Sequence, residues 1–191
     1  MNNMILRIFF LLTIYFSKIE SFNKTVIFND VVDCIELQLE EKKHYYTDIV
    51  IPIENLCFNQ RRFDEILRMK TFFLGSDFYI EMMSNSNKPI YYNPKIRFYH
   101  TVLGGWEGKK SKISISALNG PGLTCGSTDT ANLLHKFYFT ELEIVIKKHG
   151  LVQYFEYGFL RFECQLEPIN VTHLAFGIGE LGDGRVFYDC P

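Results

Sequence analysis

The feature that most constrains this chain is a recurring short run of alternating apolar residues that ends at a turn signal. In residues 137–147, for example, Leu142, Ile144 and Ile146 recur at every second position. Such alternation places apolar side chains on one face of a strand, whereas a helix needs a spacing of three to four residues. The pattern predicts an all-β fold, an antiparallel β-sandwich of the jelly-roll kind, rather than βαβ units. We expect about ten to twelve strands and no confident helix after the N-terminal segment.

Two pairs of alternating runs are predicted to form hairpins. The first pair is residues 95–103 and 111–117, which are joined by a glycine-containing turn. The second pair is residues 67–73 and 78–82, which flank the turn formers at residues 75–77. Consecutive strands joined by a short turn of this composition commonly pair with one another.

The N-terminus predicts a signal peptide over residues 1–21 and secretion to the extracellular space. Arg7 precedes an apolar run at residues 8–16, and a polar stretch ending at Ser21 follows. An apolar run of this length is too short to span a bilayer as a helix and suits a signal peptide, with an uncleaved anchor as the alternative. We therefore expect one secreted β-sandwich domain over residues 22–191, without membrane insertion, because a chain of this size buries a sizeable core.

Five cysteines follow the predicted signal peptide: Cys34, Cys57, Cys125, Cys164 and Cys190. In an oxidising compartment most of them should form disulfides, and four cysteines can pair in three ways. The odd cysteine is then a free thiol or bridges two chains in a disulfide-linked dimer. We expect Cys190 to be the odd one because a chain terminus is least constrained. No two cysteines have the short spacing of a zinc site.

Two sequons and the net charge bear on modification and partners. Asn23 and Asn170 begin Asn-Lys-Thr and Asn-Val-Thr, which predict N-glycosylation in a secreted protein. The formal net charge is −2. Binding to nucleic acid relies on a basic excess, so we expect no nucleic-acid partner.

The sequence contains no evident catalytic or cofactor-binding constellation. No G-x-S-x-G or metal-ligand motif accompanies the five scattered histidines, which are His44, His100, His135, His149 and His173. The stretch from Gly177 to Gly182 matches G-x-G-x-x-G, but a dinucleotide loop must open a helix and needs an acidic residue about twenty positions later. Only nine residues follow Gly182, so we interpret the stretch as a β-turn. We expect no catalytic residue, no metal and no cofactor.

Four segments occur in an order that resembles the farnesoic acid O-methyltransferase-like domain of arthropods and other invertebrates. VLGGWEGKKSKISI is similar to its central motif, and MKTFFLGSDFYIEMMS resembles its upstream hairpin. LEIVIKKHGLVQYFEYG and HLAFGIGELGDGRVFYDC resemble its later strands and its closing strand pair. The central motif contributes a glycine pair, a tryptophan, a lysine and a serine: Gly104, Gly105, Trp106, Lys110 and Ser111. The resemblance covers residues 64–190 and implies a compact β-rich domain of secreted or cell-surface proteins.

The family name implies an S-adenosylmethionine-dependent methyltransferase that acts on farnesoic acid in sesquiterpenoid (juvenile hormone) metabolism. In one interpretation of the hairpin tip, Trp106, Lys109 and Lys110 present an aromatic face and two cations to a sugar ring or an acidic ligand. In the other, which we favour for these three residues, Trp106 caps the sandwich and the lysines are solvated. We predict a secreted non-catalytic binding module whose partner is a carbohydrate, a lipid-like small molecule or another protein. The methyltransferase and a structural, disulfide-linked secreted protein are the alternatives.

Overall fold

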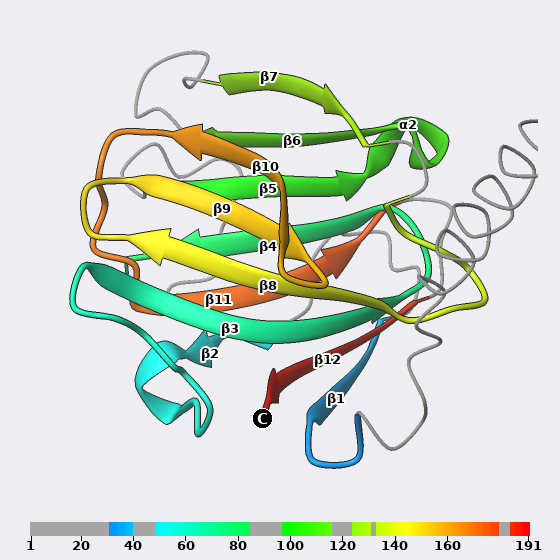
Figure 1. The fold of residues 1–191 in the computed structure, drawn as a ribbon, viewed down its shortest axis with the longest axis horizontal. Helices are drawn as coiled ribbons and strands as arrows, with labels where there is room; N and C mark the ends of the chain where they lie inside the picture. Colours follow the sequence, from blue (N-terminus) through cyan, green and yellow to red (C-terminus); the bar gives the residue numbers. More distant parts are fainter. Residues whose placement is uncertain (1–30, 40–48, 85–96, 116–123, 131–132, 180–183) are drawn as a thin grey trace, which may run out of the picture.

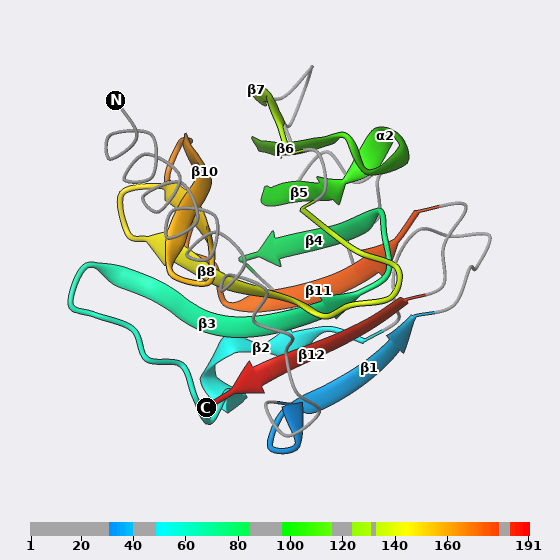
Figure 2. The ribbon, with the colours of Figure 1, turned by 45° about the vertical axis from the view of Figure 1, so that its right-hand side comes forward.

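The computed structural model describes residues 31–39, 49–84, 97–115, 124–130, 133–179 and 184–191. Two six-stranded sheets face each other in it, as Figure 1 and Figure 2 show. In sheet order, the first sheet consists of β1 (Ile35–Leu39), β12 (Gly184–Cys190), β3 (Glu65–Leu74), β8 (Thr140–Lys147), β9 (Leu151–Glu156) and β10 (Phe159–Gln165). The second consists of β2 (Ile51–Pro52), β11 (His173–Ile178), β4 (Phe78–Met83), β5 (Phe98–Gly104), β6 (Lys110–Ile115) and β7 (Thr124–Asp129).

Every pairing between these strands is antiparallel, so the predicted antiparallel β-sandwich is confirmed. The twelve strands of the described residues agree with the expected number. Apart from Val31, helical structure in the same residues is limited to the turns η3 (Ile53–Asn55) and α2 (Gly105–Gly108). No helix in this part of the chain is long and apolar enough to cross a membrane. The predicted signal peptide and Asn23 lie outside the described residues.

The core lies between the sheets and consists of the side chains that the alternating pattern directs inward. Leu142, Ile144 and Ile146 of β8 are fully buried, as the pattern predicts. The rings of Phe73 and Phe78 meet edge to face across the two sheets, with centroids 5.0 Å apart. Burial of each large apolar side chain contributes about 1.5–3 kcal/mol, so these positions hold the two sheets together.

The prediction for the first hairpin is confirmed and the prediction for the second is wrong. β5 pairs with β6, with Thr101 opposite Ile113. β3 and β4 belong to different sheets, and the turn at residues 75–77 carries the chain from one sheet to the other. The Gly75 amide donates to His135 O and the Asp77 carbonyl accepts from Gly179 N, so this turn bonds to other segments. Alternation alone cannot separate the two cases, because strands of either sheet face the same core.

The closing segment shows the same behaviour. β11 lies in the second sheet beside β4, and β12 lies in the first sheet between β1 and β3. The last two strands therefore do not pair with one another, although they follow each other in the chain. The expectation of a closing strand pair is wrong for the same reason as the β3–β4 hairpin.

The disulfides correct the expectation for Cys190. Cys34 and Cys190 are joined, because the antiparallel register of β1 and β12 brings their Cα atoms to 4.5 Å. A second disulfide joins Cys125 of β7 to Cys164 of β10 and so links the edges of the two sheets. The free cysteine is the exposed Cys57. The terminus is not loose here, since its last strand is an interior strand of a sheet. Two disulfides fit a protein of an oxidising compartment.

Candidate functional site

The glycine motif at the tip of the β5–β6 hairpin forms a tightly packed corner. Gly104 has φ 61°, and a Cβ there would lie 3.0 Å from Leu134 Cδ1. The buried Ser111 hydroxyl accepts a hydrogen bond from the Gly104 amide at 3.2 Å and pairs with Thr130 Oγ1 at 2.7 Å. Gly104 thus allows a left-handed backbone conformation, and Ser111 forms a buried hydrogen bond with Thr130. Both motif residues therefore contribute to the stability of the fold.

Two of the three predicted binding residues at this tip, Lys109 and Lys110, have described side chains. Trp106 belongs to α2, but its side chain lies outside what the structure describes, so its role stays a prediction. The Lys109 amide donates to Gly105 O at 3.1 Å and closes α2. The side chains of Lys109 and Lys110 are exposed.

Two of the histidines are held by neighbouring side chains. His100 Nδ1 lies 2.5 Å from Glu81 Oε1, and its ring stacks on Tyr79 with centroids 5.5 Å apart. His173 Nδ1 lies 2.8 Å from Thr172 Oγ1. Among the residues with described positions, no group of three or more His, Cys, Asp or Glu side chains could hold a metal ion.

The G-x-G-x-x-G stretch does not have the context of a nucleotide loop. β11 ends at Ile178, and the next described element after residues 180–183 is the strand β12. A dinucleotide loop instead leads from a strand directly into a helix whose N-terminus binds the pyrophosphate.

An open cleft of about 1020 Å³ lies at one end of the sandwich. Figure 1 places the β8–β9 turn and the β10–β11 connection at the left-hand end, whereas α2 lies at the right. Four segments far apart in the sequence converge there: residues 53–66, Ser84, Lys148 and residues 168–173. The volume is at the upper end of the roughly 300–1,000 Å³ that is typical of small-ligand sites.

The first wall of the cleft is the loop that runs from η3 to β3. Its start is fixed by Asp189, whose carboxylate oxygens accept the amide protons of Cys57 and Phe58, both at 2.7 Å. Its end is fixed by the buried Glu65, which accepts from the Arg62 amide at 2.8 Å. Two buried carboxylates therefore hold an irregular segment in one conformation, because a bond from a backbone amide to a charged oxygen is strong.

Glu65 is itself part of an ion-pair network behind the wall. Arg68 donates to both oxygens of Glu65 and, at 2.7 Å, to Glu143. The hydrogen bonds from Arg68 lower the pKa of Glu65 below its ordinary value, although burial acts in the opposite direction. The network keeps this carboxylate charged and engaged, so Glu65 supports the wall and is not a free acid for chemistry.

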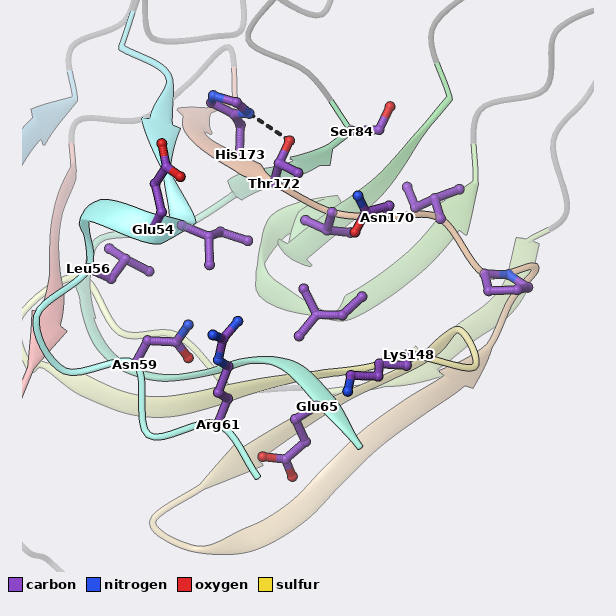
Figure 3. Close-up of a pocket in the computed structure, with 15 residues that line it drawn as sticks. Glu54, Leu56, Asn59, Arg61, Glu65, Ser84, Lys148, Asn170, Thr172 and His173 are labelled. Atoms are coloured by element: carbon purple, nitrogen blue, oxygen red, sulfur yellow. Dashed lines mark hydrogen bonds between the residues drawn. The ribbon is translucent and has the colours of Figure 1, made fainter. Parts of the chain in front are cut away.

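The second wall is the β10–β11 connection. The fully buried Tyr99 hydroxyl donates to Glu167 O at 2.8 Å and accepts from the Ile169 amide at 3.0 Å. Thr172 is tied to β4 by a 2.7 Å bond from its amide to Met83 O. This wall therefore has a fixed backbone, and Figure 3 shows Asn170, Thr172 and His173 along it.

The rim of the cleft carries charge and one unusually exposed aromatic ring. Lys148 Nζ donates to Phe63 O at 2.7 Å and lies 4.9 Å from the centre of the Phe63 ring. The Phe63 side chain is nevertheless 94% exposed. Arg61 also lines the cleft and has no ion pair within the described part of the chain. Glu54 of η3 also lines the cleft and lies to the left of Lys148 in Figure 3.

The comparisons with known proteins bear on the family. A family model described as farnesoic acid O-methyl transferase matches residues 58–191. The chain belongs to this family. The predicted resemblance over residues 64–190 is thereby confirmed. A search of curated proteins found no match.

Solved structures with a similar fold include galectin LEC-6 of Caenorhabditis elegans, with 14% identity over 85% of this chain and 98% of that one, at a TM-score of 0.48. The Bacillus licheniformis β-glucanase has 9% identity over 85% and 80% of the two chains, at a TM-score of 0.41. Alginate lyase Aly36B has 10% identity over 82% and 78%, at a TM-score of 0.41.

Of the residues named from the sequence, Asn170 and His173 line the cleft. The run Arg61-Arg62-Phe63, which follows η3, was given no role from the sequence. An aromatic residue next to two arginines in a segment without alternation was the available signal. Lys148 and Asn170 lie about a hundred residues further along the chain than this run. Only the fold brings them close to it.

Proposed function

We propose that this family member is an extracellular binding module that takes an acidic saccharide in the cleft between the η3–β3 loop and the β10–β11 connection. The single observation that carries the proposal is that Arg61 and Lys148 both line the cleft and that Lys148 Nζ lies 4.9 Å from the centre of the exposed Phe63 ring. An aromatic face suits the apolar face of a sugar ring, and the two cations suit a carboxylate or a sulfate.

The other polar groups of the cleft suit hydroxyl groups. Asn59 uses its Oδ1 to accept from the Arg68 amide at 3.1 Å, which leaves its NH₂ group to donate. The side chains of Asn170, Ser84 and Glu54 line the cleft without a hydrogen bond to any described residue. A saccharide hydroxyl both donates and accepts, so a mixed set of amide, hydroxyl and carboxylate groups can satisfy it.

The charge balance of the rim favours an anion. The lining includes two cations, Arg61 and Lys148, and two carboxylates, of which Glu65 is neutralised by Arg68, so that Glu54 alone opposes the two positive charges. The interaction lies at the surface and is therefore sensitive to screening by salt. Binding of an acidic saccharide should weaken when the salt concentration is raised from 0.05 to about 0.5 M.

Methyl transfer remains the alternative that the family description suggests, and a structural disulfide-linked role is the other. Methyl transfer requires S-adenosylmethionine, whereas the G-x-G-x-x-G stretch begins at the end of the strand β11 and is followed in the sequence by the strand β12. Calorimetric titration with S-adenosylmethionine tests this alternative, and saturable binding would support it over the saccharide proposal.

The proposal is tested with an array of carboxylated and sulfated glycans next to their neutral counterparts. Phe63→Ala and Arg61→Gln should each weaken the acidic signals, by about fivefold for the ring and tenfold for the guanidinium. Phe137→Ala is the matched control for the ring, because Phe137 is also exposed, at 86%, but has no cation–π contact with Lys148 of the cleft. Equal signals from acidic and neutral glycans would contradict the proposal.

A further inference from the structure

Asn170 is placed at the tip of a tight turn inside the cleft. The Val171 amide donates to Ile169 O at 3.0 Å, which makes Asn170 the central residue of a γ-turn. Ile169 and Val171 are 9% and 2% exposed, whereas Asn170 is exposed and lines the cleft. Its neighbours are thus directed into the core and its own side chain is directed into the cleft, between Thr172 and Lys148 in Figure 3.

The backbone on both sides of Asn170 is fixed. Tyr99 holds the Ile169 amide, and the Thr172 carbonyl accepts from the Ile53 amide at 2.8 Å. The bond of Thr172 to β4 adds a third anchor. A group attached to the Asn170 amide nitrogen would therefore start from a fixed point within the cleft and would extend through it toward the opposite wall.

Asn170, Val171 and Thr172 form an N-glycosylation sequon. We propose that Asn170 carries an N-linked glycan whose first sugars occupy the cleft, so that the glycosylated form excludes other ligands. In the transfer, the Asn170 amide nitrogen bonds to the anomeric carbon of a polyprenyl-diphosphate-linked oligosaccharide. The carbon–oxygen bond to the diphosphate breaks with its electron pair, and the nitrogen loses one proton.

The consequence is a protein with two forms. The form with a glycan at Asn170 has a filled cleft, and the form without it presents Arg61, Lys148 and Phe63 to an external saccharide. The exclusion of ligand rests on the proposed function of the cleft. The position of the glycan does not, because it follows from the direction of the Asn170 side chain alone.

The position of the glycan is tested on protein secreted from cells that perform N-glycosylation. Mass spectrometry of the Asn170 peptide measures occupancy, and Thr172→Ser is the matched control that keeps the sequon while Asn170→Gln removes it. Native protein is then acetylated with an N-hydroxysuccinimide ester, before and after enzymatic removal of the glycan. We expect Lys148 to react at least fivefold faster after removal, whereas the exposed Lys136 outside the cleft keeps its rate.

An unmodified Asn170 overturns the proposal. Equal reactivity of Lys148 in the two forms also overturns it, because the glycan would then point to solvent. The array of carboxylated and sulfated glycans is applied to both forms last, and at least tenfold stronger signals are expected from the deglycosylated form. If neither form binds although Lys148 is protected, the proposed function fails and the position of the glycan stands. If both forms bind equally, the exclusion of ligand is refuted.

Discussion

Asp189 gives the sharpest test of how the cleft is held together. It lies in β12 with φ 53° and is 2% exposed, and its two oxygens accept the amides of Cys57 and Phe58 at 2.7 Å each. Asp189→Ala removes both bonds and also places an alanine in the left-handed region. A hydrogen bond to a charged group contributes about 1.5–3 kcal/mol, and the left-handed backbone costs a non-glycine residue about 1–2 kcal/mol.

Water that reaches the half-exposed loop offsets part of these losses, so we expect Asp189→Ala to lower the free energy of unfolding by about 3–5 kcal/mol. Asp189→Gly loses the same two bonds without the backbone strain and should be about 1 kcal/mol less destabilised. Asp189→Asn keeps one acceptor oxygen and tolerates the left-handed region, so it should be the mildest of the three. For a domain of this size 1 kcal/mol corresponds to roughly 2–4 °C in Tm.

Thermal unfolding of the three variants gives the ranking, and hydrogen exchange shows where the stability is lost. The amides of Cys57 and Phe58 should exchange faster in every variant than in the wild type, and most in Asp189→Gly and Asp189→Ala. The reasoning would be refuted if Asp189→Gly had the wild-type Tm and the two amides remained protected. The loop would then be held by its apolar contacts and not by the carboxylate.

Three further predictions concern the thiol, the buried carboxylate and the hairpin corner. Native protein should react with one equivalent of a thiol reagent at Cys57, and Cys57→Ser should abolish the reaction; any labelling of another cysteine would contradict the disulfide assignment. Because its bonds to Arg68 lower the pKa of Glu65, this carboxylate stabilises the fold above the ordinary glutamate pKa. That stability is lost as the pH falls through the lowered pKa of Glu65. The free energy of unfolding of Glu65→Gln should therefore depend less on pH in the acid range than that of the wild type. Identical dependence on pH in the two proteins would refute this. Gly104→Ala should lower Tm more than Gly108→Ala, because both glycines are left-handed, with φ 61° and 81°, but only at Gly104 does a new Cβ meet a side chain within 4 Å; equal losses would show that the corner is not tightly packed.

The alternation of apolar residues was sufficient to predict the fold class and the inward face of individual strands. Leu142, Ile144 and Ile146 are buried as predicted, since a strand with one face on the core must alternate. Pairing was predicted less well. β5 and β6 are a hairpin and β3 and β4 are not, although both pairs have the same local pattern. Which sheet a strand joins depends on contacts distant in the sequence, such as the bond from Gly75 to His135.

The site was less accessible from the sequence than the fold. The conspicuous cluster of glycine, tryptophan and lysine drew attention to the hairpin tip, where Gly104 and Ser111 serve the packing of a corner. The cleft is assembled from side chains of four distant segments, and the glycosylation sequon at Asn170 is the one motif among them that was named from the sequence. Likewise, the last cysteine was expected to be free, but the register of β1 and β12 brings Cys190 beside Cys34.

The most direct test of the central claim compares the wild type with Arg61→Gln on the array of carboxylated, sulfated and neutral glycans. Arg61 is exposed and unpaired among the described residues, so the substitution should leave the fold and its Tm unchanged. In the unglycosylated wild type, acidic glycans should give the strongest signals, and these signals should fall about tenfold in Arg61→Gln. Acidic signals that persist undiminished in Arg61→Gln, or an array without any acidic signal, would contradict it.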